Sequence, residues 1–179
     1  MTKSFSLSCL VLSRISVGET DQVVTTLSAL RGKLRVVAKG SRQLHSTKRA
    51  ALEPGNIVTA HCINTASMPL LTQARLTSSA RQAATSLARL RRFHQLLEIV
   101  DRLFVEEELE AELYEFVLSI RRQLLEPAGR HHQARRQLEE LVVRLGYPSL
   151  AQTSHRNVNE YVSQLTGRGL HSFEYLLVK

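Results

Sequence analysis

The chain has 179 residues, of which 43% are apolar and 22% are charged, with only 8 Gly and 4 Pro. This composition excludes long disordered regions, and no stretch reaches the ~20 apolar residues of a membrane span. The formal net charge of +8 favours polyanions as partners. We therefore expect a globular, cytoplasmic protein with no membrane segment.

The positive charge is concentrated in the first half of the chain. Residues 1–80 contain ten Lys and Arg against three Asp and Glu, whereas residues 81–179 contain fourteen against thirteen. At the same point the spacing of the apolar residues changes from alternation to a helical period. We predict two domains, a basic one over residues 1–80 and an all-α one over residues 81–179.

Short strand signals fill the first domain. Apolar residues alternate over 7–17, and a β-branched run occupies 23–26. Turns or breaks at Gly32, Pro54 and Pro69 introduce three further apolar segments. Five short strands within 80 residues favour a small closed barrel. The predicted strands cover residues 7–17, 21–30, 34–38, 57–63 and 70–76.

After Ser78 the apolar residues are spaced three and four apart, which places them on one face of each of three helices. Pro127 ends the second helix, and Gly146 ends the third. Two weaker helical segments follow at 158–165 and 173–178. The three apolar stripes cover residues 90–104, 109–124 and 138–145, and we interpret them as the core of a helical domain.

No acidic residue lies between Asp21 and Glu53, although this interval contains seven Lys and Arg together with His45. The first three cations alternate and would share one face of a strand, and 39–49 reads as a polar loop. A solvated positive surface is the simpler interpretation, but seven cations without a counter-charge favour phosphate binding. The candidate nucleic-acid-binding residues are Arg31, Lys33, Arg35, Lys39, Arg42, Lys48 and Arg49.

The strength of such binding can be anticipated from the sequence. Six phosphate contacts to a single strand imply a log–log salt slope of roughly −4, because each contributes about −0.7. Phe5 is the only aromatic residue in the first 80, so there are few platforms on which bases could stack. We expect a mainly electrostatic grip that is indifferent to sequence.

Catalytic, metal and cofactor sites are not predicted. His131 and His132 are adjacent, so on a helix they point about 100° apart and make a poor metal pair. The glutamates of 106–112 are expected at a helix N-terminus, where the dipole favours negative charge. Cys9 and Cys62 fit no metal-ligand pattern, and we expect buried free thiols.

Arginines recur on the predicted helices. We favour solvated helix faces paired with nearby glutamates; an extension of the DNA path or a receptor for an acidic peptide are the alternatives. The set comprises Arg89, Arg91, Arg92, Arg121, Arg122, Arg135 and Arg136.

Several motifs of the first half resemble, in order, the N-terminal domain of the RecO family of bacterial recombination mediators. They are Gly18-Glu19-Thr20-Asp21, the run from Gly32 to Arg42, Leu52-Glu53-Pro54 and the run from Pro69 to Ala74. In the second half, Leu145-Gly146-Tyr147 and 165–176 are similar to the same family. Between these two motifs, the family usually has an extra segment, often with a four-cysteine zinc module. This chain resembles a shortened form without that segment, so no zinc function is carried over.

The resemblance implies an α+β protein, with a five-stranded OB-fold barrel followed by an all-α helical domain. It implies non-enzymatic binding and annealing of single-stranded DNA in DNA repair, without a cofactor, by a cytoplasmic, nucleoid-associated protein. It also implies help in loading the recombinase onto strands coated by single-strand-binding protein (SSB). The implied partners are single-stranded DNA, RecR and the C-terminal tail of SSB. By position, the seven candidate residues fall where the family's basic surface lies.

Two other functions remain open. In the first, the chain is an interaction adaptor whose helical domain docks an SSB tail or another partner, with little DNA binding of its own. In the second, it is a sequence-specific regulator with a helix-turn-helix in residues 81–179. The near-neutral charge of that half weakens the second, because a recognition helix is usually basic.

Overall fold

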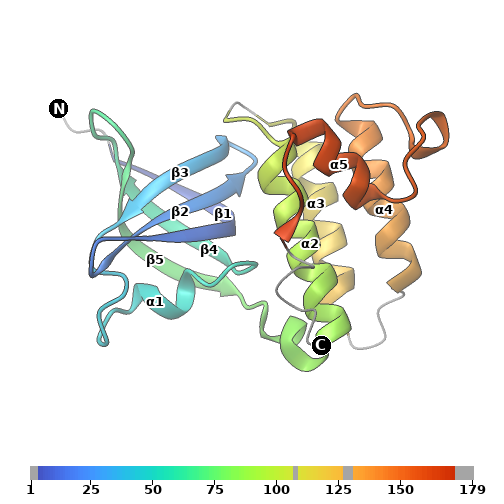
Figure 1. The fold of residues 1–179 in the computed structure, drawn as a ribbon. Coiled ribbons are helices and arrows are strands. Elements are labelled where there is room, and N and C mark those ends of the chain that lie inside the picture. The colour runs from blue at the N-terminus through green and yellow to red at the C-terminus, as the bar shows by residue number, and fades with distance from the viewer. Residues whose placement is uncertain (1–3, 107–108, 127–130, 172–179) are drawn as a thin grey trace. The chain divides into compact units, whose positions relative to one another are not determined.

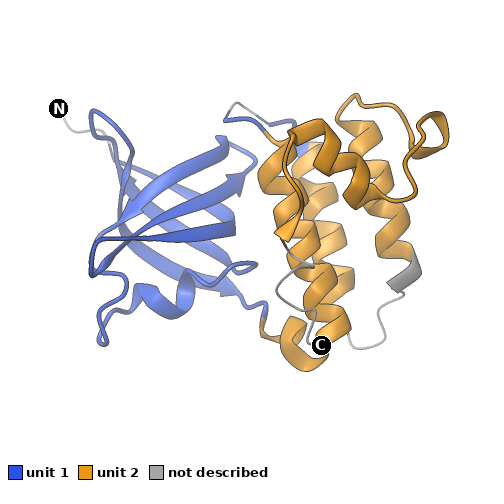
Figure 2. Ribbon diagram, in the orientation of Figure 1, with its two compact units in different colours: residues 1–80, 105–111 blue, residues 81–104, 112–179 orange. Residues whose placement is uncertain are grey.

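The computed structural model describes residues 4–106, 109–126 and 131–171. The chain divides into two compact units, one of residues 1–80 and 105–111 and the other of residues 81–104 and 112–179 (Figure 2). The helical segment predicted at 173–178 lies outside the described residues, as do Pro127 and the side chains of His131 and His132.

Five strands of the first unit close into a barrel in the order β1-β2-β3-β5-β4 (Figure 1). Neighbouring strands are antiparallel except β3 and β5, which run parallel where Val37 meets Leu70. This closed barrel, with a short helix α1 (Lys48–Ala51) between the third and fourth strands, is an OB-fold. The predicted fold class is confirmed. The strands are β1 (Ser4–Val17), β2 (Asp21–Ser28), β3 (Gly32–Ala38), β4 (Ile57–Ile63) and β5 (Leu70–Ser78).

The long strand β1 closes the barrel because it pairs with two other strands. Its first part, from Ser4 to Leu10, pairs with β4, and its second part, from Leu10 to Val17, pairs with β2. Just after this change of partner, the β1–β2 register is irregular between Val11 and Ser13. Such a bulge bends a strand, which lets one strand belong to both edges of a small barrel.

Alternating residues of each strand fill the barrel. The core holds Val24 of β2, Val36 of β3 and Val58 of β4, together with Ala51 and Leu52 at the end of α1. Because Leu34, Val36 and Ala38 point inward, the residues that alternate with them on β3 point outward. This alternation fixes the direction in which the basic side chains of β3 leave the barrel.

The second unit is helical. Two of its helices begin at residues with capping side chains: Ser86 accepts the N–H of Arg89, and Asn157 accepts the N–H of Glu160. The predicted stop at Gly146 is confirmed, with a positive φ of 87° after the last helical turn. The elements are η1 (Arg81–Thr85), α2 (Leu87–Leu103), α3 (Ala111–Leu125), α4 (His131–Arg144), η2 (Leu150–Gln152) and α5 (Val158–Thr166).

Both cysteines are free and buried in the barrel, which confirms the sequence-based expectation. Burial raises the pKa of the Cys9 thiol to about 12 and that of Cys62 to about 11, so both are protonated and unreactive near neutral pH. Over the described part of the chain, no helix is both long and apolar enough to cross a membrane. Nor do the described His, Cys, Asp and Glu residues form a group that could hold a metal ion.

Candidate nucleic-acid interface

Lys33 and Arg35 lie on the outer face of β3. Leu34, which lies between them, and Val36, which follows Arg35, pack against the barrel core. Because successive side chains of a strand point to opposite faces, both cations point outward. Arg31, which the sequence predicts on the same strand face, lies instead in the turn that joins β2 to β3. Its guanidinium stacks over the Phe5 ring at 3.8 Å from the ring centroid. We call Arg31 and Lys33 the hairpin group.

The other cations of the acid-free segment gather around the end of β3. Lys39, Arg42 and Arg49 are exposed, and Lys48 is half-buried. We call these four residues the loop group. Arg42 donates from Nη1 to the Gly18 carbonyl oxygen at 3.0 Å, and Lys48 donates from Nζ to the Lys39 carbonyl oxygen at 2.7 Å. Two of the four are therefore partly engaged with the backbone while keeping further N–H donors for a ligand.

Lys48 and Arg49 do not lie on the loop that the sequence predicts. They form the first turn of α1. The physical reason lies two residues further on, where Ala51 and Leu52 are buried in the barrel core and draw the chain into a helical turn. Both cations consequently have a fixed backbone, which reduces the entropy lost when they bind an anion.

The two groups lie at opposite ends of the β2–β3 pair. Gly32 pairs with Ser28 at one end, and Ala38 pairs with Gln22 at the other. A strand of this length spans roughly 20 Å, since each residue advances about 3.3 Å. Arg35 lies between the groups on the same outer face. Two of the seven candidate residues thus lie on β3, one lies in the turn before it, and four lie in the loop and helix after it, so they do not form one cluster.

Glu53, which bounds the acid-free segment, forms an ion pair with Arg14, a cation outside that segment, at 2.7 Å. It is 50% exposed, so the pair adds little to stability. Its effect on the surface is that one of the three carboxylates in residues 1–80 is neutralised by a residue outside the candidate set.

The sequence analysis missed two exposed leucines beside these cations. Leu44 is 86% exposed within the loop group, and Leu30 is 76% exposed next to Arg31. Isolated exposed leucines are common on protein surfaces. Here their position beside cations places apolar atoms where bases would lie if phosphates bind the cations. The available signal for Leu44 was that it is the one apolar residue of the polar segment 39–47, and Leu30 had no comparable signal because it follows Ala29.

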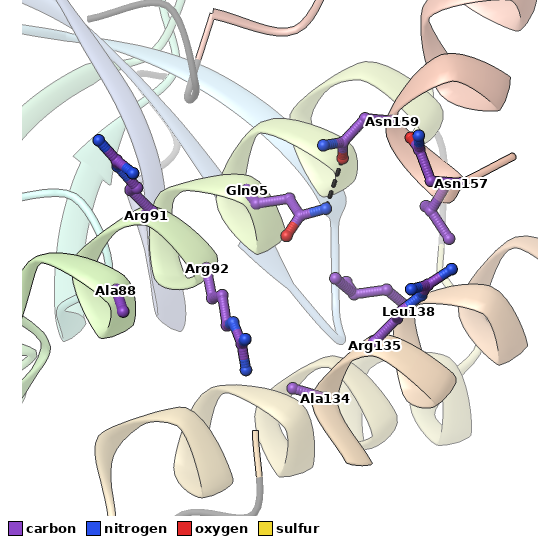
Figure 3. Close-up of a pocket in the computed structure, with 10 residues that line it drawn as sticks. Ala88, Arg91, Arg92, Gln95, Ala134, Arg135, Leu138, Asn157 and Asn159 are labelled. Atoms are coloured by element: carbon purple, nitrogen blue, oxygen red, sulfur yellow. Dashed lines mark hydrogen bonds between the residues drawn. The ribbon is translucent and has the colours of Figure 1, made fainter. Parts of the chain in front are cut away.

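A cavity of about 510 Å³ lies among α2, α4 and α5 of the helical unit. Its walls combine apolar side chains, such as Leu138 and Val158, with the arginines Arg91, Arg92 and Arg135. Figure 3 shows Arg92 pointing from α2 towards Ala134 on α4, and a hydrogen bond from Gln95 to Asn159 that links α2 to α5.

Arg91 Nε and Arg92 Nη1 are buried and have no hydrogen-bond partner within the described residues. Buried guanidinium donors normally find an acceptor, so Nη1 of Arg92, which points towards the cavity, favours an anionic ligand there, whereas Arg91 points away from the other lining side chains (Figure 3). Arg135 is partly neutralised by Glu139 at 3.2 Å.

The prediction of solvated helix faces is wrong for Arg89 and Arg121. They are only 8% and 4% exposed. Arg89 donates to the Thr85 hydroxyl at 2.6 Å and to the Gln82 carbonyl oxygen at 3.3 Å. Burial lowers the pKa of Arg121. These two arginines are buried within the helical unit and do not extend a binding surface.

The family model described as "Recombination protein O N terminal" matches residues 1–80, the segment that forms the barrel. The N-terminal domain places the chain in the RecO family. Proteins named DNA repair protein RecO are similar to this RecO-family chain over a longer stretch. The protein of Nocardioides sp. is 33% identical over 123 residues, which cover 68% of this chain and 50% of the relative.

Two further relatives carry the same name. The protein of Roseiflexus sp. is 32% identical over 106 residues, covering 59% of this chain and 37% of the relative. That of Desulforamulus reducens is 27% identical over 117 residues, covering 65% and 46%. Because these alignments are longer than the 80 residues of the barrel, the likeness to the RecO family continues into the helical unit. The chain spans about half the length of these relatives, or less.

Proposed function

We propose that this chain is a DNA repair protein of the recombination-mediator type, which binds single-stranded DNA without reading its sequence. The observation that carries the proposal is the set of seven cations on β3 and in the segments that flank it, in an OB barrel that matches the RecO N-terminal domain. In OB-folds, the face of strands 2 and 3 is where oligonucleotides bind. The proposed activity requires no catalytic group and no cofactor, and it belongs at the nucleoid in the cytoplasm.

The proposed hold on DNA is electrostatic. Phe5 is half-buried and the Arg31 guanidinium already stacks on its ring, so it is a poor platform for a base. Without stacked bases, the binding free energy lacks the ~1–3 kcal/mol per base that aromatic platforms contribute. Phosphate contacts then dominate, and these carry no sequence information.

Such a hold suits strand annealing and recombinase loading. A strand held by its phosphates keeps the edges of its bases accessible, so a complementary strand can pair with it. Because the contacts weaken with salt and carry no stacking term, the strand can also be released. We propose that the chain anneals complementary strands in this way and assists recombinase loading on SSB-coated DNA, with RecR as a partner.

The deciding experiment is a titration of the full chain with a labelled, mixed-sequence single-stranded oligonucleotide at several salt concentrations. Fluorescence anisotropy should give a log–log slope of roughly −4, corresponding to about six phosphate contacts. Unlabelled duplexes of several sequences serve as competitors. A slope near zero would contradict the electrostatic grip, and a strong preference for one duplex sequence would favour a regulator instead.

A second candidate function is that of an adaptor, and the cavity among α2, α4 and α5 favours it. Its apolar walls and the buried Nη1 donor of Arg92 suit a peptide that carries both carboxylates and an apolar side chain. The C-terminal tail of SSB has this chemistry. We propose that this tail docks in the cavity, whether or not the barrel binds DNA.

The adaptor function is tested with a labelled SSB tail peptide. Arg92→Ala should weaken peptide binding about tenfold, since it removes a charge-assisted contact. Arg122→Ala is the matched control, because this exposed arginine lies on α3 and does not line the cavity. Equal effects of the two variants would argue against docking in the cavity. Retained peptide binding without DNA binding would establish the adaptor alone.

A further inference from the structure

Asp21 is a carboxylate placed within the loop group, where it weakens the attraction of that surface for phosphate. It is the first residue of β2 and pairs with Val17 across the β1–β2 turn. Lys39 and Lys48 are close enough to contribute to a lowered pKa of its carboxyl. Its contacts give a physical reason for an acid at this place.

The Asp21 carboxylate binds the chain that leaves β3. Its Oδ1 atom accepts the backbone N–H of Gly40 at 2.8 Å and the hydroxyl of Thr20 at 3.0 Å. The N–H of Gly40 is the largest cause of its lowered pKa, followed by the Thr20 hydroxyl. A hydrogen bond to a carboxylate is about twice as strong as one between neutral groups. The charge of Asp21 therefore strengthens this attachment.

The two residues after Gly40 are attached to the same turn. Ser41 is buried and donates from Oγ to the side-chain oxygen of Gln22 at 3.1 Å. The backbone N–H of Arg42 donates to the Thr20 carbonyl oxygen at 2.9 Å. Gly40 itself has a positive φ of 62°, which allows the chain to turn sharply at the first attachment. Three consecutive residues of the loop are thus fixed to residues 20–22.

We propose that Asp21 is a positioning residue, whose bond to Gly40 holds Lys39 and Arg42 in the arrangement that binds nucleic-acid phosphates. This inference rests on the proposed binding of single-stranded DNA. Asp21 touches no phosphate and acts through the backbone of the loop. Without the bond, only the attachments of Ser41 and Arg42 hold the loop, so part of its ordering falls to the ligand and that entropy is subtracted from the binding free energy.

Charge and positioning predict opposite effects for the loss of Asp21. If Asp21 acts only as a negative charge, its removal strengthens the attraction for DNA. If it positions the loop, its removal weakens binding although the surface becomes more positive. Glu19 is the matched control: it lies two residues away, is exposed, and has no side-chain hydrogen bond or ion pair within the described part of the chain.

The experiment compares Asp21→Ala with Glu19→Ala in the full chain, using the labelled single-stranded oligonucleotide at several salt concentrations. Glu19→Ala should bind as tightly as the parent or more tightly, with an unchanged slope. Asp21→Ala should bind roughly three- to tenfold more weakly at low salt. Its slope should be less steep by about 0.7 to 1.4, the contribution of one or two phosphate contacts.

Binding by Asp21→Ala that equals or exceeds that of Glu19→Ala would overturn the positioning role. If instead the parent chain binds no single-stranded DNA at any salt, the proposed function fails, and the positioning role fails with it. If the parent chain binds single-stranded DNA and Asp21→Ala binds it like Glu19→Ala, only the positioning role is contradicted.

A second pair of variants covers the case in which Asp21→Ala does not fold. Asp21→Asn keeps an oxygen that can accept the N–H of Gly40 but loses the charge that strengthens the bond. It should show faster amide hydrogen exchange at Gly40 to Arg42 than the parent and no gain in DNA affinity. Glu19→Gln should show parental exchange there. Parental exchange in Asp21→Asn, with the same gain in affinity as Glu19→Gln, would overturn the proposal.

Discussion

In the barrel, the cations between Asp21 and Glu53 lie mostly exposed along β3 and around α1, whereas several arginines of the helical unit are buried or lie beside glutamates. Arg102 pairs with Glu98 at 2.7 Å and Arg144 with Glu140 at 2.6 Å, both one helical turn apart. Arg89 and Arg121 are buried. The candidate DNA-binding cations of the barrel are thus mostly exposed, whereas several arginines of the helical unit are buried or paired with an acid.

The difference follows from local composition. A helix that carries both signs of charge places Glu and Arg four residues apart on one face, and they neutralise each other. The acid-free segment offers no such neighbour, so its cations keep their field in solution. The comparison teaches that regional charge balance is a better guide to a polyanion surface than the net charge of the whole chain.

The largest effect should come from reversing the charge of the loop group. Lys39→Glu, Arg42→Glu and Lys48→Glu together should weaken binding to single-stranded DNA about 100-fold or more at low salt, because three phosphate contacts become repulsive. The salt slope should become less steep by about 2. Anisotropy titrations measure both quantities, and circular dichroism checks that the barrel is folded.

Arg75→Glu is the control for this charge reversal. Arg75 is exposed on β5, opposite Thr59 of β4, and lies outside the acid-free segment. It should change the affinity only slightly. A loss comparable to that of the triple variant would mean that the whole barrel attracts DNA through its net charge, and the assignment to β3 and the loop group would be wrong.

A smaller effect is expected on the free energy of unfolding, which should depend on a buried arginine of the helical unit but not on an exposed arginine of the barrel. Arg121→Ala should lower the free energy of unfolding by about 2 kcal/mol, because it removes a buried group and leaves its neighbours without their contact. Arg35→Ala, on the outer face of β3, should change that free energy by less than about 0.5 kcal/mol while weakening DNA binding. Urea unfolding measures the free energy of unfolding of both variants. Equal losses of stability would contradict the difference between the buried arginine and the exposed one.

The barrel could be predicted from sequence because strand alternation is a local property. The period of two fixed the inward direction of Val36 and hence the outward direction of Lys33 and Arg35. The helix α1 could not be predicted in this way. Its four residues have no period of their own, and the burial of Ala51 and Leu52 by the rest of the barrel decides their conformation.

Contacts between distant residues account for what the sequence analysis missed at the candidate site. The attachment of Gly40 to Asp21 joins residues 19 positions apart, and nothing in the acid-free segment itself indicates it. The cavity in the helical unit is lined by residues from three helices between Ala88 and Asn159. Likewise, the burial of Arg89 and Arg121 depends on which helices pack against them, and a charged residue alone predicts exposure.

The smallest predicted effect concerns an apolar contact at the loop group. Leu44→Ala should weaken binding about two- to fivefold at every salt concentration, because it removes apolar area that bases would cover. Its salt slope should equal that of the parent, since an apolar side chain releases no counterions. Leu87→Ala, a half-exposed leucine on α2, is the control and should have no effect. Parental affinity of Leu44→Ala at every salt would show that the loop group contacts phosphates alone, whereas a uniform loss would show that the barrel also touches the bases through a leucine in place of an aromatic ring.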